Sequence, residues 1–143
     1  MLMGEFSPKL DEKNRVILPA KFHADFESGI VLTRGQERCI YGFTDRDFRD
    51  MVERLRTAPI STREGRTNLR LLMSSASDQQ PDKQHRISVP AALREYAGIE
   101  RDIVVIGMVT RIEIWDAETW RRYVEENEDS FAEVAEEVIP GMI

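Results

Sequence analysis

Residues 11–20 read DEKNRVILPA and residues 82–91 read DKQHRISVPA, so one pattern occurs twice in a chain of 143 residues. Each copy has an Asp, an Arg four positions later, and a Pro-Ala pair that begins four positions after the Arg. The residues beyond the two copies also correspond, at Gly35 and Gly107, Ile40 and Ile112, Phe43 and Trp115, Phe48 and Trp120, and Val52 and Val124. A long unit that occurs twice predicts a tandem pair of small domains with one architecture, rather than a solenoid.

The composition is that of an ordinary soluble globular chain, with 41% hydrophobic residues, 8 Gly and 6 Pro. Each half is close to the lower size limit for a self-sufficient core, so we expect the halves to share one core or to dimerise. The longest apolar runs, residues 30–32 and 103–106, are too short to span a bilayer. The first residues, MLMGE, have neither the basic start nor the apolar core of a secretory signal. We therefore expect a cytoplasmic protein with no membrane partner.

The net charge of −6 is unevenly distributed along the chain. Residues 113–143 contain ten acidic side chains and two arginines, whereas residues 1–112 contain 18 basic and 16 acidic side chains. Local basic clusters, rather than overall charge, decide which partners a surface contacts. The acidic C-terminal region therefore does not exclude an anionic partner, and we expect it to lie away from one.

Hydrophobic periodicity and turn residues predict the order β-β-α-β-β-α in each half. In the first half we expect strands at residues 3–10, 15–18, 30–33 and 38–43 and helices at residues 19–28 and 44–55. In the second half we expect strands at residues 86–89, 103–106 and 111–115 and helices at residues 90–97 and 116–126. A helix at residues 62–74 follows a break at residues 58–61, and a capping box at residues 130–133 opens a short C-terminal helix.

These elements predict four segments along the chain. They are a first repeat at residues 1–56, a connecting helical segment at residues 57–76, a second repeat at residues 77–126 and an acidic C-terminal helical tail at residues 127–143. The tail has an apolar stripe at helical spacing, which is a candidate surface for packing between subunits.

A polar turn precedes the first Arg of each copy. Asp11 and Asp82 open these turns, since an Asp side chain bonds the backbone two residues further on. Asn14 and His85 occupy one position in the two copies, and both residue types are enriched where φ is positive. We therefore expect a left-handed residue immediately before each Arg.

The motifs needed for known catalytic chemistries are missing from the sequence. A nucleophilic triad needs a histidine beside a Ser or Cys and a carboxylate, and the chain has only His23 and His85. It has no Gly-rich phosphate loop, Cys-x-x-Cys pair, His-Glu-x-x-His motif or dinucleotide fingerprint. Neither polar turn has the clustered oxygen ligands of a Ca²⁺ loop. We expect no enzyme activity, cofactor, metal or small-molecule substrate, and we expect the lone Cys39 to be a buried, inert thiol.

The tips of the two turns combine cations with an amide or an imidazole, as a surface that reads a polyanion does. Arginine suits bidentate bonding to guanine, lysine reaches phosphate or guanine, and Asn or Gln matches adenine. The candidate DNA-binding residues are Lys13, Asn14, Arg15, Lys83, Gln84, His85 and Arg86. We therefore expect the tips to contact a polyanion.

A structural role is open for the same arginines. Arg15 could bridge to Asp11, and Arg86 to Asp82, and such exposed pairs stabilise a turn by under about 1 kcal/mol each. His85 has a turn role as the alternative to a role as a ligand. The three arginines at positions 63, 66 and 70 are expected on a solvated helix face, with phosphate contact as the less favoured alternative.

With these residues identified, the chain resembles the MraZ family of bacterial transcriptional regulators, of the SpoVT-AbrB-like class, over essentially its whole length. The resemblance is carried by the two Asp-x3-Arg-x3-Pro copies, by LREYAGI at residues 93–99 and by IEIW at residues 112–115. It implies an α+β, mainly β fold, a duplicated SpoVT-AbrB-like double-split β-barrel with flanking helices. Two swapped-hairpin motifs of one chain would then replace two subunits. The family usually has Gly where this chain has Asn14 and His85, a departure that bears on loop shape and preferred sequence.

The resemblance also implies a function. It predicts a sequence-specific DNA-binding repressor that recognises short G-rich direct repeats upstream of the division and cell-wall gene cluster. It further implies a homo-oligomeric ring and association with the nucleoid. Arg15 is then the leading candidate for base contact, Lys13 for adjacent phosphate or base contact, and Lys83 and Arg86 for the second loop. Two alternatives stay open: a ring-forming protein-protein interaction module, and an antitoxin-like regulator that binds DNA and a toxin.

Overall fold

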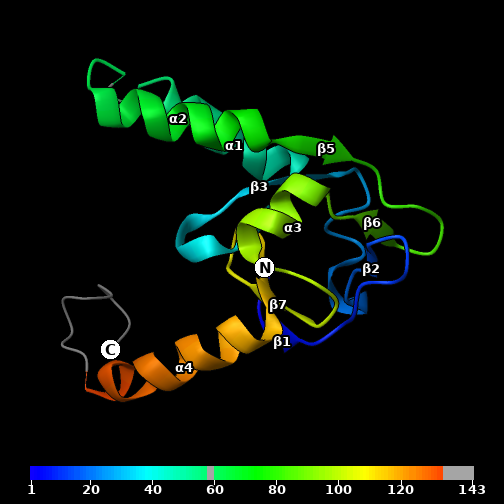
Figure 1. The fold of residues 1–143 in the computed structure, drawn as a ribbon. Coiled ribbons are helices and arrows are strands. Elements are labelled where there is room, and N and C mark those ends of the chain that lie inside the picture. Colours follow the sequence, from blue (N-terminus) through cyan, green and yellow to red (C-terminus); the bar gives the residue numbers. More distant parts are fainter. Residues whose placement is uncertain (58–59, 134–143) are drawn as a thin grey trace.

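The structure is a computed structural model, and it describes residues 1–57 and 60–133 (Figure 1). Along the chain the elements are β1 (Glu5–Phe6), β2 (Arg15–Ile17), the 3-10 helix η1 (Ala20–Phe22), β3 (Ile30–Arg34), the 3-10 helix η2 (Gln36–Arg38), β4 (Ile40–Thr44), α1 (Asp45–Leu55), α2 (Arg63–Ser75), β5 (Ser77–Gln79), β6 (Arg86–Ser88), α3 (Ala91–Ala97), β7 (Ile103–Gly107), β8 (Arg111–Asp116) and α4 (Ala117–Ala132). The fold is therefore α+β, as the sequence predicts, and its strands pair antiparallel.

The two halves of the chain interleave in one six-stranded sheet, in the order β1-β7-β8-β4-β3-β5. Each half contributes a hairpin, β3 with β4 and β7 with β8, and the hairpins join where β4 pairs with β8. The first strand of each half is added to the hairpin of the other half: β1 pairs with β7, and β5 pairs with β3. The remaining strands, β2 and β6, form a separate two-stranded ribbon, again with one strand from each half.

The main hydrophobic core draws on both halves, as expected from their small size. Its buried members from the first half are Leu2, Leu10, Val16, Leu18, Phe22, Phe26, Ile30, Leu32 and Ile40, and those from the second half are Ile87, Val89, Leu93, Ala97, Ile99, Ile103, Val105, Ile112 and Ile114. Burial of this apolar surface is the main favourable term in folding, at about 25 cal/mol per Å². The buried side chains of each half therefore pack in one cluster with those of the other.

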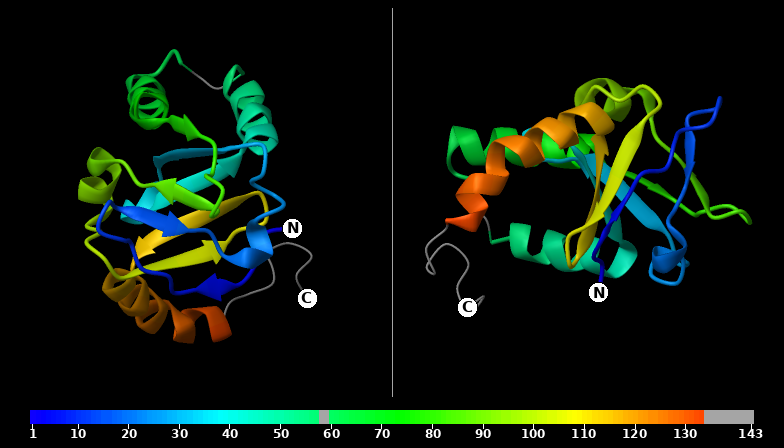
Figure 2. Two further views of the ribbon diagram at one scale, coloured as in Figure 1. Left: turned by 90° about the vertical axis from the view of Figure 1, so that its right-hand side faces the viewer. Right: turned by 90° about the horizontal axis from the view of Figure 1, so that it is seen from below.

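The helices flank the strands on two sides of the molecule. The antiparallel hairpins lie between α1 and α2 on one side and α4 on the other (Figures 1 and 2). The N-terminus of α1 is capped as its sequence predicts, since the Thr44 hydroxyl accepts a bond of 3.1 Å from the Asp47 N–H. The ribbon of β2 and β6 lies at the end of the molecule away from the start of α2 (Figure 2).

The helix expected at residues 19–28 is not present, and this prediction is wrong. The segment forms the 3-10 helix η1 and further turns, whose backbone bonds mostly join residues three apart, as from Phe22 N–H to Pro19 O at 2.8 Å. Asp and Ser, at positions 25 and 28, favour local turns over a helix interior. Burial of Phe22 and Phe26, 1% and 0% exposed, holds this tighter winding in the core. The corresponding segment of the second half does form α3, which ends at Gly98 with a φ of 64°.

Two strands are shorter than their patterns predict. The strand expected at residues 3–10 pairs as a ladder only at Glu5–Phe6, with isolated bridges from Leu2 and Lys9. The second strand of the first hairpin begins at Ile40 rather than at residue 38, because residues 37 and 38 adopt positive φ values of 62° and 64° and complete the turn. In contrast, β5 pairs with the sheet at Ser77–Gln79, where the predicted order β-β-α-β-β-α requires a strand for which the sequence pattern gives no residue range.

The prediction of a separate helix that opens at Ser130 is also wrong. Helix α4 continues to Ala132, because no Gly or Pro interrupts residues 127–129. The rest of the expected C-terminal tail, residues 134–143, and the first two residues of the expected break at residues 58–61 lie outside the described residues. Within the described ranges, no helix combines the length and the apolar character needed to cross a membrane.

Candidate nucleic-acid interface

The two repeated turns have the same internal hydrogen bonds. In the first, one carboxylate oxygen of Asp11 accepts from the N–H groups of Lys13 and Arg15, at 2.8 and 2.9 Å. The other oxygen accepts from the Arg15 Nε at 2.8 Å. In the second turn, Asp82 accepts in the same way from Gln84 N–H at 2.8 Å, Arg86 N–H at 2.9 Å and Arg86 Nε at 2.7 Å. One Asp side chain thus organises each turn.

The residue before each Arg has the predicted left-handed backbone. The φ angle is 60° at Asn14 and 61° at His85, and each N–H donates to the carbonyl of the Asp that opens its turn, at 2.9 Å. Asn and His tolerate this region better than most residues with a Cβ. The turn therefore keeps one shape in both halves.

Hydrogen bonding keeps both turn carboxylates charged. The pKa of Asp11 lies below its ordinary value, chiefly because the Arg15 backbone N–H bonds to the carboxylate. The pKa of Asp82 is lowered in the same way by the Arg86 N–H. Each Asp therefore remains an acceptor for its Arg at neutral pH.

Each arginine is held at one nitrogen only. The side chains of Arg15 and Arg86 are 27% and 25% exposed, and each donates its Nε to the Asp four residues earlier. Among the described residues, no hydrogen bond joins a terminal nitrogen of either guanidinium to another group. A guanidinium has five N–H donors, so the bridge orients each Arg and leaves its terminal donors for another group. The bridging role and the binding role, open from sequence, are therefore compatible.

The ribbon of β2 and β6 connects the two turns. Arg15 pairs with Ser88, Val16 with Ile87, and Ile17 with Arg86. The central pair, Val16 and Ile87, is buried at 1% exposure each and anchors the ribbon to the core. Because the strands are antiparallel, the turns project as two separate tips from opposite ends of the ribbon, the blue and yellow-green loops at the right of Figure 2. The structure thus brings all seven candidate residues to one end of the molecule.

Each turn is held in place by the other half of the chain. The Leu18 N–H donates to the carbonyl of His85 at 2.9 Å, and the Val89 N–H donates to the carbonyl of Asn14 at 3.0 Å. Leu18 and Val89 occupy the same position in the two copies, at the end of each repeated strand. The backbone of one tip therefore depends on the position of the strand that belongs to the other.

Sequence reasoning missed two side chains that support these tips. His23 bonds through Nε2 to the Leu18 carbonyl at 2.6 Å, and its ring stacks on His85 with centroids 3.7 Å apart. Arg94 lies at the matching position of the second half and donates its Nε to the Val89 carbonyl at 3.1 Å. The common spacing of five residues after Leu18 and Val89 is the signal that could have identified this pair.

The exposed residues at the tips differ between the copies. Lys13, Lys83 and Gln84 are exposed, and neither lysine has an ion-pair partner among the described residues. Glu12 stands at the position of Lys83, so the first tip carries an acid where the second carries a cation. The arginines at the base of the tips are thus the cations that both copies share.

Helix α2, in the connecting segment, lies away from the two turns (Figure 1). Helix α2 extends away from the ribbon (Figure 1), and Arg66 donates to the backbone carbonyls of Ile60 and Ser61, at 3.1 and 3.0 Å. Arg66 therefore fastens the start of α2. The geometry favours the helix-face interpretation of this side chain over contact with a phosphate at the tips.

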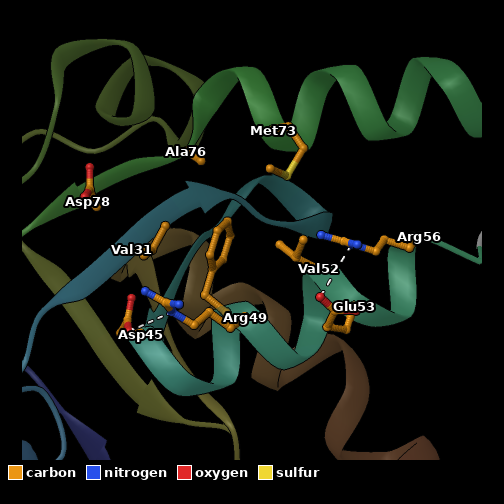
Figure 3. A pocket seen from close by; sticks show the side chains of 10 residues that line it. Val31, Asp45, Arg49, Val52, Glu53, Arg56, Met73, Ala76 and Asp78 are labelled. Atoms are coloured by element: carbon orange, nitrogen blue, oxygen red, sulfur yellow. Dashed lines mark hydrogen bonds and ion pairs between the residues drawn. The ribbon is translucent and has the colours of Figure 1, made fainter.

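A hollow of about 540 Å³ lies between α1 and α2, on the side of the sheet where β3 and β5 pair (Figure 3). Its lining is apolar at Val31, Val52 and Met73. Four of the charged side chains that line it form ion pairs, Arg49 with Asp45 at 3.0 Å and Arg56 with Glu53 at 3.4 Å, and Asp78 is the other charged residue of the lining. This hollow therefore presents no convergent set of unpaired polar groups.

Other reactive side chains have no active-site geometry in the described residues. Cys39 is fully buried and unpaired, as expected, and burial raises the pKa of its thiol, which opposes nucleophilic reactivity. In residues 1–57 and 60–133, no three His, Cys, Asp or Glu side chains gather as a metal site.

The family of the chain follows from sequence comparison. The family model described as "MraZ protein, putative antitoxin-like" matches residues 1–71 and again residues 72–140. The chain belongs to the MraZ family. Proteins named transcriptional regulator MraZ from Micrococcus luteus and Clavibacter michiganensis are 54% and 53% identical over 142 residues, covering 99% of each chain. One from Frankia alni is 52% identical over 143 residues and the full length of both chains.

Membership of the MraZ family indicates the class of function to which the chain belongs. The family is one of transcriptional regulators, which is the function class that the sequence predicts. The two matches of the family model agree with the repeated architecture of the chain, because each covers one copy of the turn. The resemblance inferred from the paired motifs is thereby confirmed.

Proposed function

We propose that this MraZ-family chain is a sequence-specific DNA-binding regulator whose two turns read double-stranded DNA. The observation that carries the proposal is the pair of matched turns, in which Asp11 orients Arg15 and Asp82 orients Arg86 at one end of the molecule. A pre-oriented guanidinium loses little freedom on binding, so its terminal donors suit the O6 and N7 atoms of guanine.

The remaining tip residues have complementary roles. Lys13 and Lys83 are exposed cations that can hold phosphates on either side of the groove. Asn14 and Gln84 carry amides of the kind that match adenine, and His85 shapes the second tip through its left-handed backbone. All seven candidate residues thus divide into base readers, phosphate contacts and turn formers.

The wider assembly and target follow from the resemblance. The chain acts as a repressor at short G-rich direct repeats upstream of the division and cell-wall gene cluster, in the cytoplasm and on the nucleoid. Its fold is a duplicated SpoVT-AbrB-like double-split β-barrel with repeats at residues 1–56 and 77–126. Copies assemble into a homo-oligomeric ring, which sets several tips against successive DNA repeats and gains affinity through high effective concentration. The acidic C-terminal part of α4 lies away from the DNA.

Fluorescence anisotropy tests this function. Wild type, Arg15→Ala and Arg86→Ala are titrated, at several salt concentrations, against duplexes with G-rich direct repeats and against scrambled duplexes. Wild type is expected to prefer the repeats and to weaken steeply with salt, because phosphate contacts release counterions. Each Arg→Ala change is expected to cost about 1–3 kcal/mol of binding free energy and to reduce the preference for the repeats.

Arg49→Ala is the matched control. Arg49 makes the same kind of bond, Nε to the Asp four residues earlier at 3.0 Å, but it lies on α1 rather than on the ribbon. Its removal is expected to leave DNA affinity unchanged. If wild type fails to bind DNA in low salt while its assembly is intact, the ring-forming protein-interaction module becomes the better function.

The antitoxin-like alternative has one observation in its favour, the wording of the family description. It predicts a complex with a second protein in addition to DNA binding. Co-purification from cells with the tagged full-length chain, with and without the Arg15→Ala change, separates that partner from DNA-bridged neighbours.

A further inference from the structure

Ile17 is the one residue of β2 that is both apolar and exposed. Its relative exposure is 56%, whereas its neighbours Val16 and Leu18 are 1% and 2% exposed. An exposed apolar side chain is common on protein surfaces and by itself assigns no role. Ile17, however, lies on the ribbon between the two turns that carry Arg15 and Arg86, and this position suggests a role.

Ile17 shares a face of the ribbon with both arginines. Side chains two residues apart in a strand point to the same side, which places Arg15 and Ile17 together on β2 and Arg86 and Ser88 together on β6. The register pairs Ile17 with Arg86 and Arg15 with Ser88, so these four side chains form one surface. The other face of the ribbon, with Val16 and Ile87, is buried in the core.

The side chains of Ile17 and Arg86 lie especially close across the ribbon. The Arg86 N–H donates to the Asp82 carboxylate, and the Arg86 carbonyl accepts from the Asp82 N–H, so neither backbone group bonds to Ile17. Directly opposed residues of this non-hydrogen-bonded type have the shortest separation in an antiparallel pair. A group that contacts Arg86 from this face of the ribbon is therefore within reach of the apolar surface of Ile17.

An arginine beside an exposed branched aliphatic side chain matches a particular base step. Guanine presents O6 and N7 in the major groove, and thymine presents a C5-methyl group there, which proteins read by apolar contact. We propose that Ile17 is a specificity-determining residue that packs on the methyl group of a thymine next to the guanine contacted by Arg86. This inference rests on the DNA-binding function proposed above and adds thymine to the bases that the ribbon reads.

Only the first copy has an exposed apolar residue at this position of the strand. The position that corresponds to Ile17 in the second copy is Ser88, a polar residue that lies opposite Arg15. The Gln79 side chain bonds to both the N–H and the carbonyl of Ser88, at 2.8 Å each, and fixes that edge of the ribbon. The two tips therefore read non-equivalent base steps, although the turns that carry them are alike.

Replacing thymine by deoxyuridine tests the contact, because it removes only the methyl group. The probes are two duplexes with the same G-rich direct repeats flanked by thymines, one of them with deoxyuridine in place of every thymine. Wild type is expected to bind the thymine duplex about fourfold more tightly for each methyl group that it buries. Ile17→Ser is expected to lose this preference and to bind both duplexes equally.

Three controls separate the contact from other effects. Ser88→Ala, on the same face, is expected to keep the wild-type preference for thymine. Ser88→Ile is expected to increase that preference by adding a second apolar contact, and it tests the idea without changing Ile17. Thermal unfolding by circular dichroism verifies that each variant is folded.

Equal affinity of wild type for the two duplexes would overturn the role of Ile17 while leaving the DNA-binding function in place. A preference for thymine that persists in Ile17→Ser would also overturn it, because the preference would then come from duplex shape. Failure of wild type to bind either duplex in low salt would overturn the DNA-binding function and this inference together.

Discussion

Asp11 and Asp82 each support a complete turn with one side chain. Each carboxylate accepts two backbone N–H groups and the Nε of an arginine, so it stabilises the turn and orients the residue that is proposed to read DNA. Both carboxylates have a lowered pKa, which means that the folded turn favours the charged form. Folding stability and guanidinium placement are thus linked at these two positions.

This linkage predicts a pH dependence. A carboxyl group whose pKa is lower in the folded state stabilises the protein above its unfolded pKa and loses that contribution as the pH falls through the folded pKa. Replacing Asp11 and Asp82 by Ala is therefore expected to lower stability at pH 7. The difference from wild type should shrink below about pH 4, near the ordinary pKa of Asp. Urea unfolding between pH 7 and pH 2.5 measures it, and a constant difference across this range would contradict the prediction.

The N-terminal segment and the β7–β8 hairpin depend on each other as elements. The Gly107 N–H donates to the carbonyl of Gly4 at 2.9 Å, and Leu2 and Val109 exchange two backbone bonds at 2.8 and 3.3 Å. A Cβ on Gly107 would lie 2.2 Å from the Met3 nitrogen, which is backbone and cannot rotate away. The glycine therefore permits the first half of the chain to pass directly over the second.

Gly107→Ala is accordingly expected to destabilise the protein by about 2 kcal/mol or more, through overpacking against backbone. Gly98→Ala is the comparison, because a Cβ there meets nothing within 4 Å and only its φ of 64° is unfavourable. That change is expected to cost about 1 kcal/mol. Urea unfolding of both variants measures the two costs, and equal losses would argue against a close backbone approach at Gly107.

At the scale of the molecule, the two halves form one folding unit. Both halves contribute strands to the six-stranded sheet and to the ribbon, and side chains to the core. A second buried cluster joins Cys39 of the first half to Trp115 of the second. Because the halves are interleaved, we expect a core substitution in one half to lower the stability of both halves equally.

Phe26→Ala tests this cooperativity. The side chain is fully buried in the first half, so its removal is expected to cost about 3–5 kcal/mol. Both tryptophans, Trp115 and Trp120, are in the second half and report on unfolding by fluorescence. In Phe26→Ala, the unfolding transition seen by tryptophan fluorescence is expected to shift by the same amount as the transition seen by circular dichroism. Phe131→Ala, at a side chain that is 60% exposed, is the control and should change stability by less than about 0.5 kcal/mol. Separate transitions would show that the halves unfold independently.

Local chemistry in the sequence was sufficient for the turns and most elements. The Asp that opens each turn and the left-handed positions of Asn14 and His85 follow from residue types that act on their own backbone. The two hairpins, α1, α2 and α3 follow from periodicity and capping within a dozen residues. The seven candidate residues could be chosen for the same reason, since each lies in or beside a turn that the local sequence predicts.

The pairing of the halves required contacts that no local pattern encodes. Which strand completes which hairpin, the union of β2 with β6, and the stacking of His23 on His85 all join residues about 45 to 100 positions apart. The first helix was mispredicted because burial of Phe22 and Phe26 in a core shared by both halves outweighed local helical spacing. Local propensities are worth fractions of a kcal/mol per residue, whereas burial of one large apolar side chain is worth about 1.5–3 kcal/mol, so tertiary packing prevails where the two disagree.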